Sequence, residues 1–226
     1  MSENLLDKKE ILCLLQLASS TLPVGAYSYS EGLETLVERG VISGAETLGD
    51  WLGRSLARGS IRVETAVLRR VYHCFRAGDL AGVTRWDAWL SATRETAELR
   101  QQSAQMGRSL LKLSIELHPD LTVPFADGCN YATAFAIAAV TWEISEETAI
   151  LGYLQSWASN LITAGVRTIP LGQTAGQSVL LKLQPRLLRA TEEILQLPDD
   201  RLESWSWGLS LASIAHETQY SRLFRS

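Results

Sequence analysis

The chain has 226 residues, a formal net charge of −4 and an isoelectric point near 5.5. This acidic balance argues against nucleic acid as the main partner, because phosphate binding needs a basic surface. Hydrophobic residues make up 46% of the chain and charged residues only 20%, which predicts a substantial core and one face covered by a partner. A compact monomer is the alternative.

The cysteines and histidines give no metal or disulfide pattern. Three cysteines are far apart and form no CxxC pair, which favours a reduced, cytoplasmic compartment. The three histidines are isolated, so no resident transition-metal site is expected. The N-terminus lacks the layout of a signal peptide, and the longest nearly apolar run, residues 131–142, is too short to span a bilayer.

Apolar positions repeat with a helical period along the first half of the chain. The predicted helices cover residues 5–18, 30–39, 43–57, 61–75, a segment after 79, and 95–117. Ser43 is expected to cap the third helix in a capping box with Glu46, and Asp79 to cap the helix that carries Trp86 and Trp89. Gly40 is expected to end the second helix.

The second half of the chain continues the helical pattern. Residues 131–142 are apolar almost all round and predict a buried helix, and further helices are expected at 145–164, 176–195 and 202–220. No alternating strand pattern occurs. The sequence therefore predicts one all-α domain over residues 1–226, a bundle of roughly eight to ten helices with a flexible N-terminus (1–6) and C-terminal tail (221–226).

The segment from Arg167 to Gln177 interrupts this pattern. Pro170 fixes its own φ and disfavours helix at the residue before it, while Gly172 and Gly176 permit close backbone approach. Gln173 and Gln177 are four residues apart and share one face if the segment is helical. We expect Arg167, Gln173 and Gln177 to join this turn to the loop at residues 23–30.

That loop, Pro23-Val-Gly25-Ala-Tyr27-Ser28-Tyr-Ser30, is the second unusual segment. Its tyrosines and hydroxyls suit either a recognition loop or a tight turn between helices. Glu31 and Glu34 follow it on either side of Gly32 and are three residues apart. Such a pair suits acid–base work or a hard cation, or supplies favourable charge at the start of a helix.

The tail places Leu223 and Phe224 between Arg222 and Arg225. Apolar and cationic residues at a chain end suit docking, either on a partner that offers a pocket and carboxylates or on the protein's own body. No P-loop or GxSxG signature occurs, so neither a P-loop nucleotide hydrolase nor an α/β hydrolase is indicated.

Four segments in this order resemble the urease accessory protein F (UreF) family. They are Leu22–Glu34, Gln105–Ser109, Ala164–Gln177 and the tail at Arg222–Ser226. The resemblance implies an all-α, dimeric, non-enzymatic chaperone that binds the accessory proteins D (also called H) and G. It also implies that the assembly delivers nickel to apo-urease, with nickel as transient cargo and no cofactor held by the chain.

The resemblance singles out candidate partner-binding or structural residues and no catalytic or metal-binding residue. They are Pro23, Gly25, Tyr27, Ser28, Ser30, Glu31, Gly32, Glu34, Arg167, Pro170, Gly172, Gln173, Gly176, Gln177, Arg222, Leu223, Phe224 and Arg225. The chain departs from the family pattern at Asn130, Ala132 and Ala136, where His, Pro and Gly are common. Any role of that histidine in metal handling is therefore in doubt here.

Two other functions remain open from the sequence. One is a regulator that activates the G protein's GTPase by inserting a catalytic arginine. The other is an all-α small-molecule enzyme that uses Glu31, Glu34 and a tyrosine around an apolar pocket. The first requires an arginine whose loss removes stimulation without loss of binding, and the second requires turnover without partners.

Overall fold

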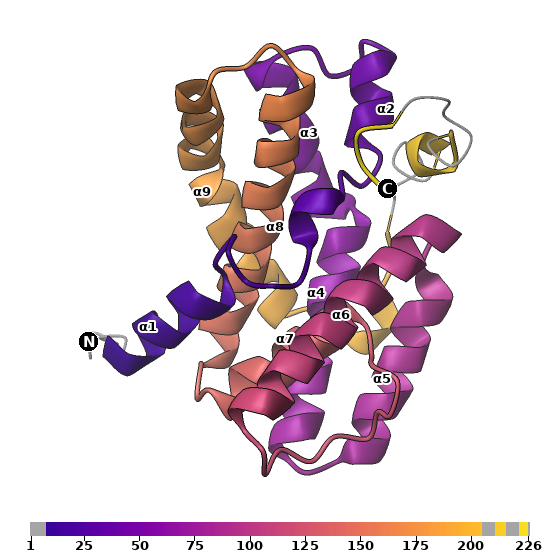
Figure 1. The fold of residues 1–226 in the computed structure, drawn as a ribbon, viewed down its shortest axis with the longest axis vertical. Coiled ribbons are helices and arrows are strands. Elements are labelled where there is room, and N and C mark those ends of the chain that lie inside the picture. Colours follow the sequence, from indigo (N-terminus) through magenta and orange to yellow (C-terminus); the bar gives the residue numbers. More distant parts are fainter. Residues whose placement is uncertain (1–7, 205–210, 216–221, 226) are drawn as a thin grey trace.

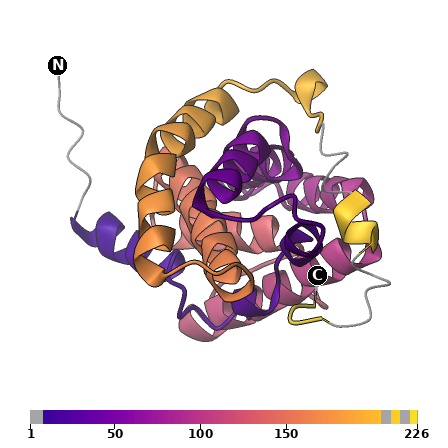
Figure 2. The same cartoon turned by 90° about the horizontal axis from the view of Figure 1, so that it is seen from above.

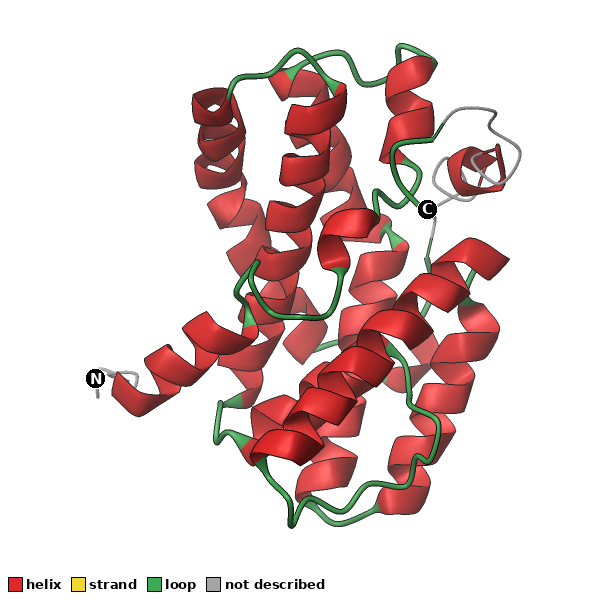
Figure 3. Ribbon diagram, viewed as in Figure 1, coloured by secondary structure: helices red, strands yellow, loops and turns green. Residues whose placement is uncertain are grey.

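Helices form all the regular secondary structure in the part of the chain that the computed structural model describes, residues 8–204, 211–215 and 222–225 (Figure 3). The predicted all-α fold is therefore confirmed. The long helices, in chain order, are α1 (Lys8–Leu17), α3 (Ala45–Arg58), α4 (Ser60–Arg76), α5 (Leu80–Thr93), α6 (Ala97–Leu117), α7 (Tyr131–Thr141), α8 (Glu146–Thr168) and α9 (Gln173–Leu195). The short ones are η1 (Ala26–Ser28), α2 (Leu33–Glu38) and η2 (Asp199–Arg201).

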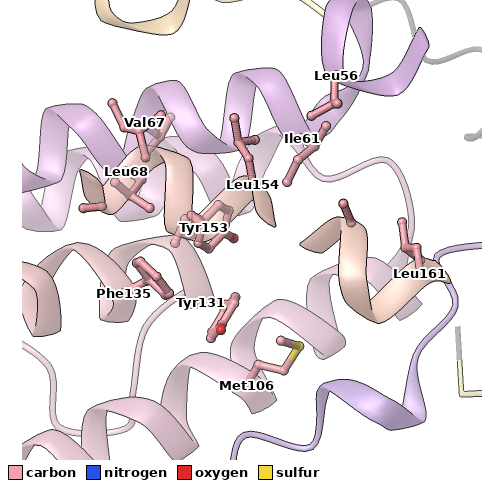
Figure 4. Close-up of a cluster of buried hydrophobic side chains, with 14 of the residues drawn as sticks. Leu56, Ile61, Val67, Leu68, Met106, Tyr131, Phe135, Tyr153, Leu154 and Leu161 are labelled. Atoms are coloured by element: carbon pink, nitrogen blue, oxygen red, sulfur yellow. The ribbon is translucent and has the colours of Figure 1, made fainter. Parts of the chain in front are cut away.

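Helix α7 forms the centre of the lower half of the bundle. It packs against both α4 and α6 (Figure 1). Every alanine from Ala132 to Ala139 is fully buried. Small side chains let the neighbouring helices come close on all sides, which is what the all-round apolar sequence predicted. Phe135 and Tyr153 meet edge to face at 5.0 Å between ring centroids, in the cluster that Figure 4 shows.

Helices α3, α8 and α9 form the upper half, with α9 packed against both of the others. Seen from above, the light-orange α9 lies along the outer edge of this half (Figure 2). Helix α4 contacts all three helices, so the two halves share one core. Helix α1 lies at the side of the bundle and contacts α7 and α8 (Figure 1), and Glu10 in its first turn accepts from Ser145 N at 2.9 Å. Its side chains Leu12 and Leu15 are exposed.

Several predicted helix boundaries need correction. Asp79 caps α5 as expected, since its carboxylate accepts from Gly82 N at 2.8 Å. The predicted capping box of Ser43 and Glu46 is wrong, because Gly44 is the N-cap and Thr47 Oγ1 accepts from Gly44 N at 3.1 Å. Threonine reaches back over one turn here, so the acidic side chain is not needed.

The break at Pro170 is shorter than predicted. Helix α8 continues to Thr168 instead of ending near 164, and α9 already begins at Gln173 instead of 176. Helix α2 begins at Leu33 instead of 30, because Glu31 and Gly32 have positive φ. Of the helix expected at 202–220, residues 211–215 are helical, and most of the rest lies outside the described residues. The flexibility expected for residues 1–6 also falls outside them.

None of the helices in the described part of the chain combines the length and hydrophobicity needed to cross a membrane.

Candidate functional site

The loop before α2 directs two nearby carboxylates to different surroundings. Glu31 has φ of 53° and Gly32 has φ of 77°, so two successive residues have positive φ just before α2 begins. Positive φ is uncommon outside glycine, and its cost at Glu31 must be met by the contacts of the folded protein. As a result Glu31 lines an internal cavity, whereas Glu34 meets the C-terminal tail.

The Glu31 carboxylate is held by two donors from other helices. Trp157 Nε1 of α8 donates at 3.0 Å and Gln102 Nε2 of α6 donates at 3.3 Å. The residue keeps some exposed surface, but its carboxylate is surrounded by protein. Loss of hydration, together with the nearby Glu64 charge, raises the pKa of Glu31 to about 7.

A buried ion pair between Glu64 of α4 and Arg94, which follows α5, forms the other wall of this cavity. Tyr153 OH donates to the same Glu64 oxygen at 2.6 Å, and Arg94 Nη2 donates to Ser103 Oγ at 3.1 Å. Burial by itself would lower the pKa of Arg94, but the Glu64 carboxylate outweighs burial and raises it. The Glu64 carboxylate therefore keeps the buried Arg94 guanidinium charged.

The space between these groups is small. The cavity measures about 40 Å³, and Arg94 Nε has no hydrogen-bond partner among the described residues. A water molecule needs roughly 10–15 Å³ on this scale, so a few waters fit and an organic substrate does not. Within the described residues, no group of three or more His, Cys, Asp or Glu side chains is placed to hold a metal ion.

The C-terminal tail lies against the body of the protein at Glu34. The two carboxylate oxygens accept from Leu223 N at 2.7 Å and from Phe224 N at 3.1 Å. Arg222 pairs with Glu98 of α6 at 2.6 Å. The tail therefore docks through its backbone on a carboxylate, as a short peptide does on a receptor.

Arg167 joins this tail to the loop at residues 23–30. Its guanidinium lies 4.8 Å from the centre of the Phe224 ring, and its Nη1 donates to Tyr27 O at 3.3 Å. Arg225 N donates to Ser28 O at 2.9 Å, and Phe224 is only 4% exposed. Three segments that the sequence singled out separately thus meet on one surface, which we call the tail site (Tyr27, Ser28, Glu34, Arg167 and Leu223–Arg225).

The remaining members of the Arg167–Gln177 segment lie elsewhere. Gln173 and Gln177 begin α9 and line a groove against α1, and among the described residues neither bonds to the loop at 23–30. Gly176 is buried against Ile162 and Val166 of α8. Of the three side chains expected to join the turn to that loop, only Arg167 makes the contact.

The loop at residues 23–30 buries some of its side chains and exposes others. Val24, which follows Pro23, and Ser30 are buried, and Gly25 has φ of 76° just before η1. Tyr29 is also buried, and Asn160 of α8 donates to its carbonyl oxygen at 3.3 Å. Tyr27, by contrast, is 69% exposed. The loop is therefore both a packed turn and a source of exposed side chains.

Sequence reasoning missed most of the cavity. The residues that complete it are Glu64, Arg94, Gln102, Tyr153 and Trp157. One signal was present in α4, where Glu64 lies on the same helical face as Leu68 and Val71. A carboxylate inside an apolar stripe predicts a buried partner. The position of that partner, 30 residues away at Arg94, depends on the tertiary fold.

Asn130 serves as a joint between α5, α6 and α7. Its side chain donates to Ser91 Oγ at 2.7 Å and to Asp87 O at 3.0 Å, and accepts from Ser103 Oγ at 3.1 Å. A Cβ at Gly107 would lie 2.0 Å from Cys129 O, so glycine is required where α6 crosses this joint. At this position, where the family commonly has histidine, the asparagine side chain is thus held by hydrogen bonds to α5 and α6.

Comparisons with known proteins identify the family of this chain. A model of the UreF family matches residues 42–184, and a urease accessory protein UreF from Microcystis aeruginosa is 68% identical over 98% of this chain and all of its own length. The chain belongs to the UreF family. UreF proteins from Nostoc sp. and Chromohalobacter salexigens are 56% and 41% identical, covering 100% and 97% of the chain and 100% and 96% of their own lengths.

The family match and the tail site overlap only in part. Arg167 lies within the matched residues 42–184, whereas the loop at 23–30, Glu34 and the tail lie outside them. The aligned UreF relatives nevertheless extend over nearly the whole chain. The chain is therefore UreF-like beyond the region that the family model recognises.

Proposed function

We propose that this chain is a non-catalytic scaffold that helps insert nickel into apo-urease by binding the D/H-type and G accessory proteins in the cytoplasm. Membership of a urease accessory family supports the pathway. The tail site supports a role in partner binding, because it presents exposed side chains around the backbone hydrogen bonds that hold the tail. The cavity is too small for an organic substrate, which favours a binding role over the small-molecule enzyme.

The observation that carries this proposal is the convergence of loop, Arg167 and tail. Leu223 is 53% exposed and Tyr27 is 69% exposed, whereas Phe224 of the same site is buried. Exposed apolar side chains fixed on an ordered backbone are suited to partner contact, since little conformational entropy is lost on binding. We expect the D-type protein to cover this surface.

Co-purification with the D-type protein tests this expectation. Truncation after Tyr220 should abolish co-purification while the helical circular dichroism spectrum is retained. Leu223→Ser should weaken it, whereas Leu117→Ser, an exposed leucine at the far end of α6, should leave it unchanged. Retained co-purification after truncation contradicts the proposed contact.

We also propose that the chain forms a homodimer through a groove between α1, α8 and α9. The groove has a volume of about 780 Å³ and is lined by Leu14, Leu151 and Leu180 among others. Leu15 and Leu188, both exposed, lie on the same surface. A two-fold interface uses one patch on both copies, so a surface that offers both leucines and a groove fits it. Light scattering of Leu15→Glu should then show a monomer, with Leu117→Glu as the control.

The path of nickel is a separate part of the proposal. Glu31 at the cavity, and Glu34 once the tail leaves it, would offer oxygen ligands that bind a passing ion weakly, as transfer requires. Loss of urease activation in cells that carry both Glu31→Gln and Glu34→Gln would support this role. Full activation by that double variant would exclude it.

The alternative GTPase-activating role makes a different prediction. Arg167 is one of two exposed arginines of the tail site, with Arg225, but it stacks on Phe224 in this structure and would have to leave it to reach a nucleotide. A catalytic arginine predicts that Arg167→Ala removes GTPase stimulation without loss of G-protein binding. The scaffold role predicts instead that Arg167→Ala changes GTPase stimulation and G-protein binding together.

A further inference from the structure

A second surface feature lies where α3 meets α4. It is a hollow of about 410 Å³, which we call the arginine hollow, and it is lined by Ala57, Arg58, Arg62, Arg201 and Glu203. It shares no lining residue with the tail site or with the groove beside α1. Three guanidinium groups on a chain with a net charge of −4 need a specific explanation.

The backbone under the arginine hollow is firmly held. Gly59 N donates to Ser55 O at 2.7 Å and Arg62 N donates to Gly59 O at 3.1 Å, so α3 passes directly into α4. Leu56 and Ile61, on either side of this junction, belong to the buried cluster in Figure 4. Arg58 and Arg62 therefore project from a rigid support.

The third arginine is tied to the same support. Arg70 of α4 donates through Nη2 to Leu197 O at 2.9 Å and pairs with Asp199, the first residue of η2, at 2.6 Å. These bonds fix η2, and hence Arg201, against α4. The spacing of the three guanidinium groups is thus set by the fold.

The charges in the arginine hollow are not balanced within the described part of the chain. Elsewhere in the described part of the chain, six arginines form ion pairs with carboxylates: Arg69, Arg70, Arg94, Arg186, Arg189 and Arg222. No such ion pair is made by Arg58, Arg62 or Arg201 with any described residue, and Glu203 is the one acidic side chain in the lining. The hollow is therefore a local excess of positive charge.

Helix stability does not account for this arrangement. Arg58 is in the last turn of α3, where a cation is favourable, but Arg62 is in the first turn of α4, which contains no acidic residue. A cation is unfavourable at a helix N-terminus, and Gly59 offers no side chain to cap the helix. The positions of these arginines are therefore better explained by the binding of an anionic ligand than by the stability of the chain itself.

We propose that the arginine hollow binds a carboxylate-rich segment of a partner protein. Arg58, Arg201 and Glu203 are exposed, so the hollow is open to solvent. Pockets for small molecules typically bury roughly 70–90% of the ligand's surface, and a hollow this open does not. Planar guanidinium groups bind carboxylates through two parallel hydrogen bonds, and three of them on a fixed support can engage successive acidic side chains. Because the chain as a whole is negatively charged, it repels an acidic segment except where positive charge is concentrated, as it is in the arginine hollow.

Fluorescence anisotropy with a labelled hexaglutamate peptide tests this proposal. The full-length protein should bind the peptide, and Arg58→Glu combined with Arg62→Glu should weaken binding by about tenfold or more. Arg85→Glu combined with Arg100→Glu makes the same charge change on exposed residues of α5 and α6 and should change binding by less than about twofold.

Three results would overturn the proposal. They are absence of binding by the wild-type protein, equal losses in the two double variants, and displacement of the peptide by inorganic phosphate at a lower concentration than by free hexaglutamate. The last result would identify a phosphate site instead. Because no accessory protein is present, the outcome is independent of the proposed binding of the D-type and G proteins.

Discussion

Glu31 and Glu34 are separated by three positions in the sequence and behave as different chemical groups. Glu31 lies against the cavity beside a second carboxylate, and its pKa is raised to about 7. Glu34 lies at the protein surface and accepts two backbone hydrogen bonds from the tail. The difference shows that the backbone reversal at Glu31 and Gly32, and not the residue type, assigns each carboxylate its role.

The cavity and the tail site are also stabilised by different kinds of interaction. The cavity depends on buried charges that are costly to separate, whereas the tail site depends on partly exposed hydrogen bonds and one aromatic contact. Mutations in the cavity should therefore have large effects on global unfolding, whereas mutations in the tail site should act mainly on local opening and change global unfolding little.

Removal of Arg94 should have the largest effect. Arg94→Met leaves the buried Glu64 without its cation and should lower the free energy of unfolding by about 3–5 kcal/mol in urea denaturation. Glu64→Gln combined with Arg94→Met should recover part of this loss. Arg222→Met breaks the more exposed pair with Glu98 and should cost less than about 1 kcal/mol. Equal losses for Arg94→Met and Arg222→Met would remove the distinction between the sites.

Glu31→Gln should change how stability depends on pH. Because folding raises the pKa of Glu31 from 4.5 to about 7, its contribution is full below pH 4.5 and is lost as the pH rises to 7. The shift corresponds to roughly 3 kcal/mol. The wild type should thus lose stability relative to the glutamine variant across this window and not above it.

Urea unfolding at several pH values measures this difference. Glu38→Gln, an exposed acid on α2, is the matched control for the loss of one carboxylate. A difference between wild type and Glu31→Gln that stays constant with pH would show that the Glu31 carboxylate is not enclosed.

Glu34→Ala should release the tail and leave the core intact. The variant removes both acceptors for Leu223 N and Phe224 N, a local loss of about 1–2 kcal/mol. Hydrogen exchange at these two amides should become roughly tenfold faster, with little change in global unfolding. Glu38→Ala should leave the exchange rates as they are. Unchanged exchange in Glu34→Ala would mean that other contacts hold the tail.

Arg167→Ala should have the smallest effect. It removes the cation–π contact with Phe224 and the bond to Tyr27 O, at about 0.5–1 kcal/mol. The melting temperature should fall by roughly 1–4 °C, whereas Arg85→Ala, an exposed residue on α5, should leave it unchanged. A fall as large as that of Arg94→Met would place Arg167 in the core network instead.

Much of the fold was readable from local patterns. The positions of the long helices, the burial of α7 and the Asp79 cap follow from periodicity, composition and capping chemistry, all of which act within a few residues. The capping box at Ser43 was wrong because Thr47 competes with Glu46 for the same backbone donors. Such local competition is not resolved by residue type alone.

By itself the sequence determined the all-α class, the family resemblance and the three segments of the tail site. The meeting of these segments, and the pairing of Glu64 with Arg94 and of Glu31 with Trp157, were decided only by the tertiary structure. Helical periodicity records which face of a helix is buried, but it carries no information on which other helix covers that face. Contacts between residues 34 and 223, or 31 and 157, therefore arise only when the bundle closes.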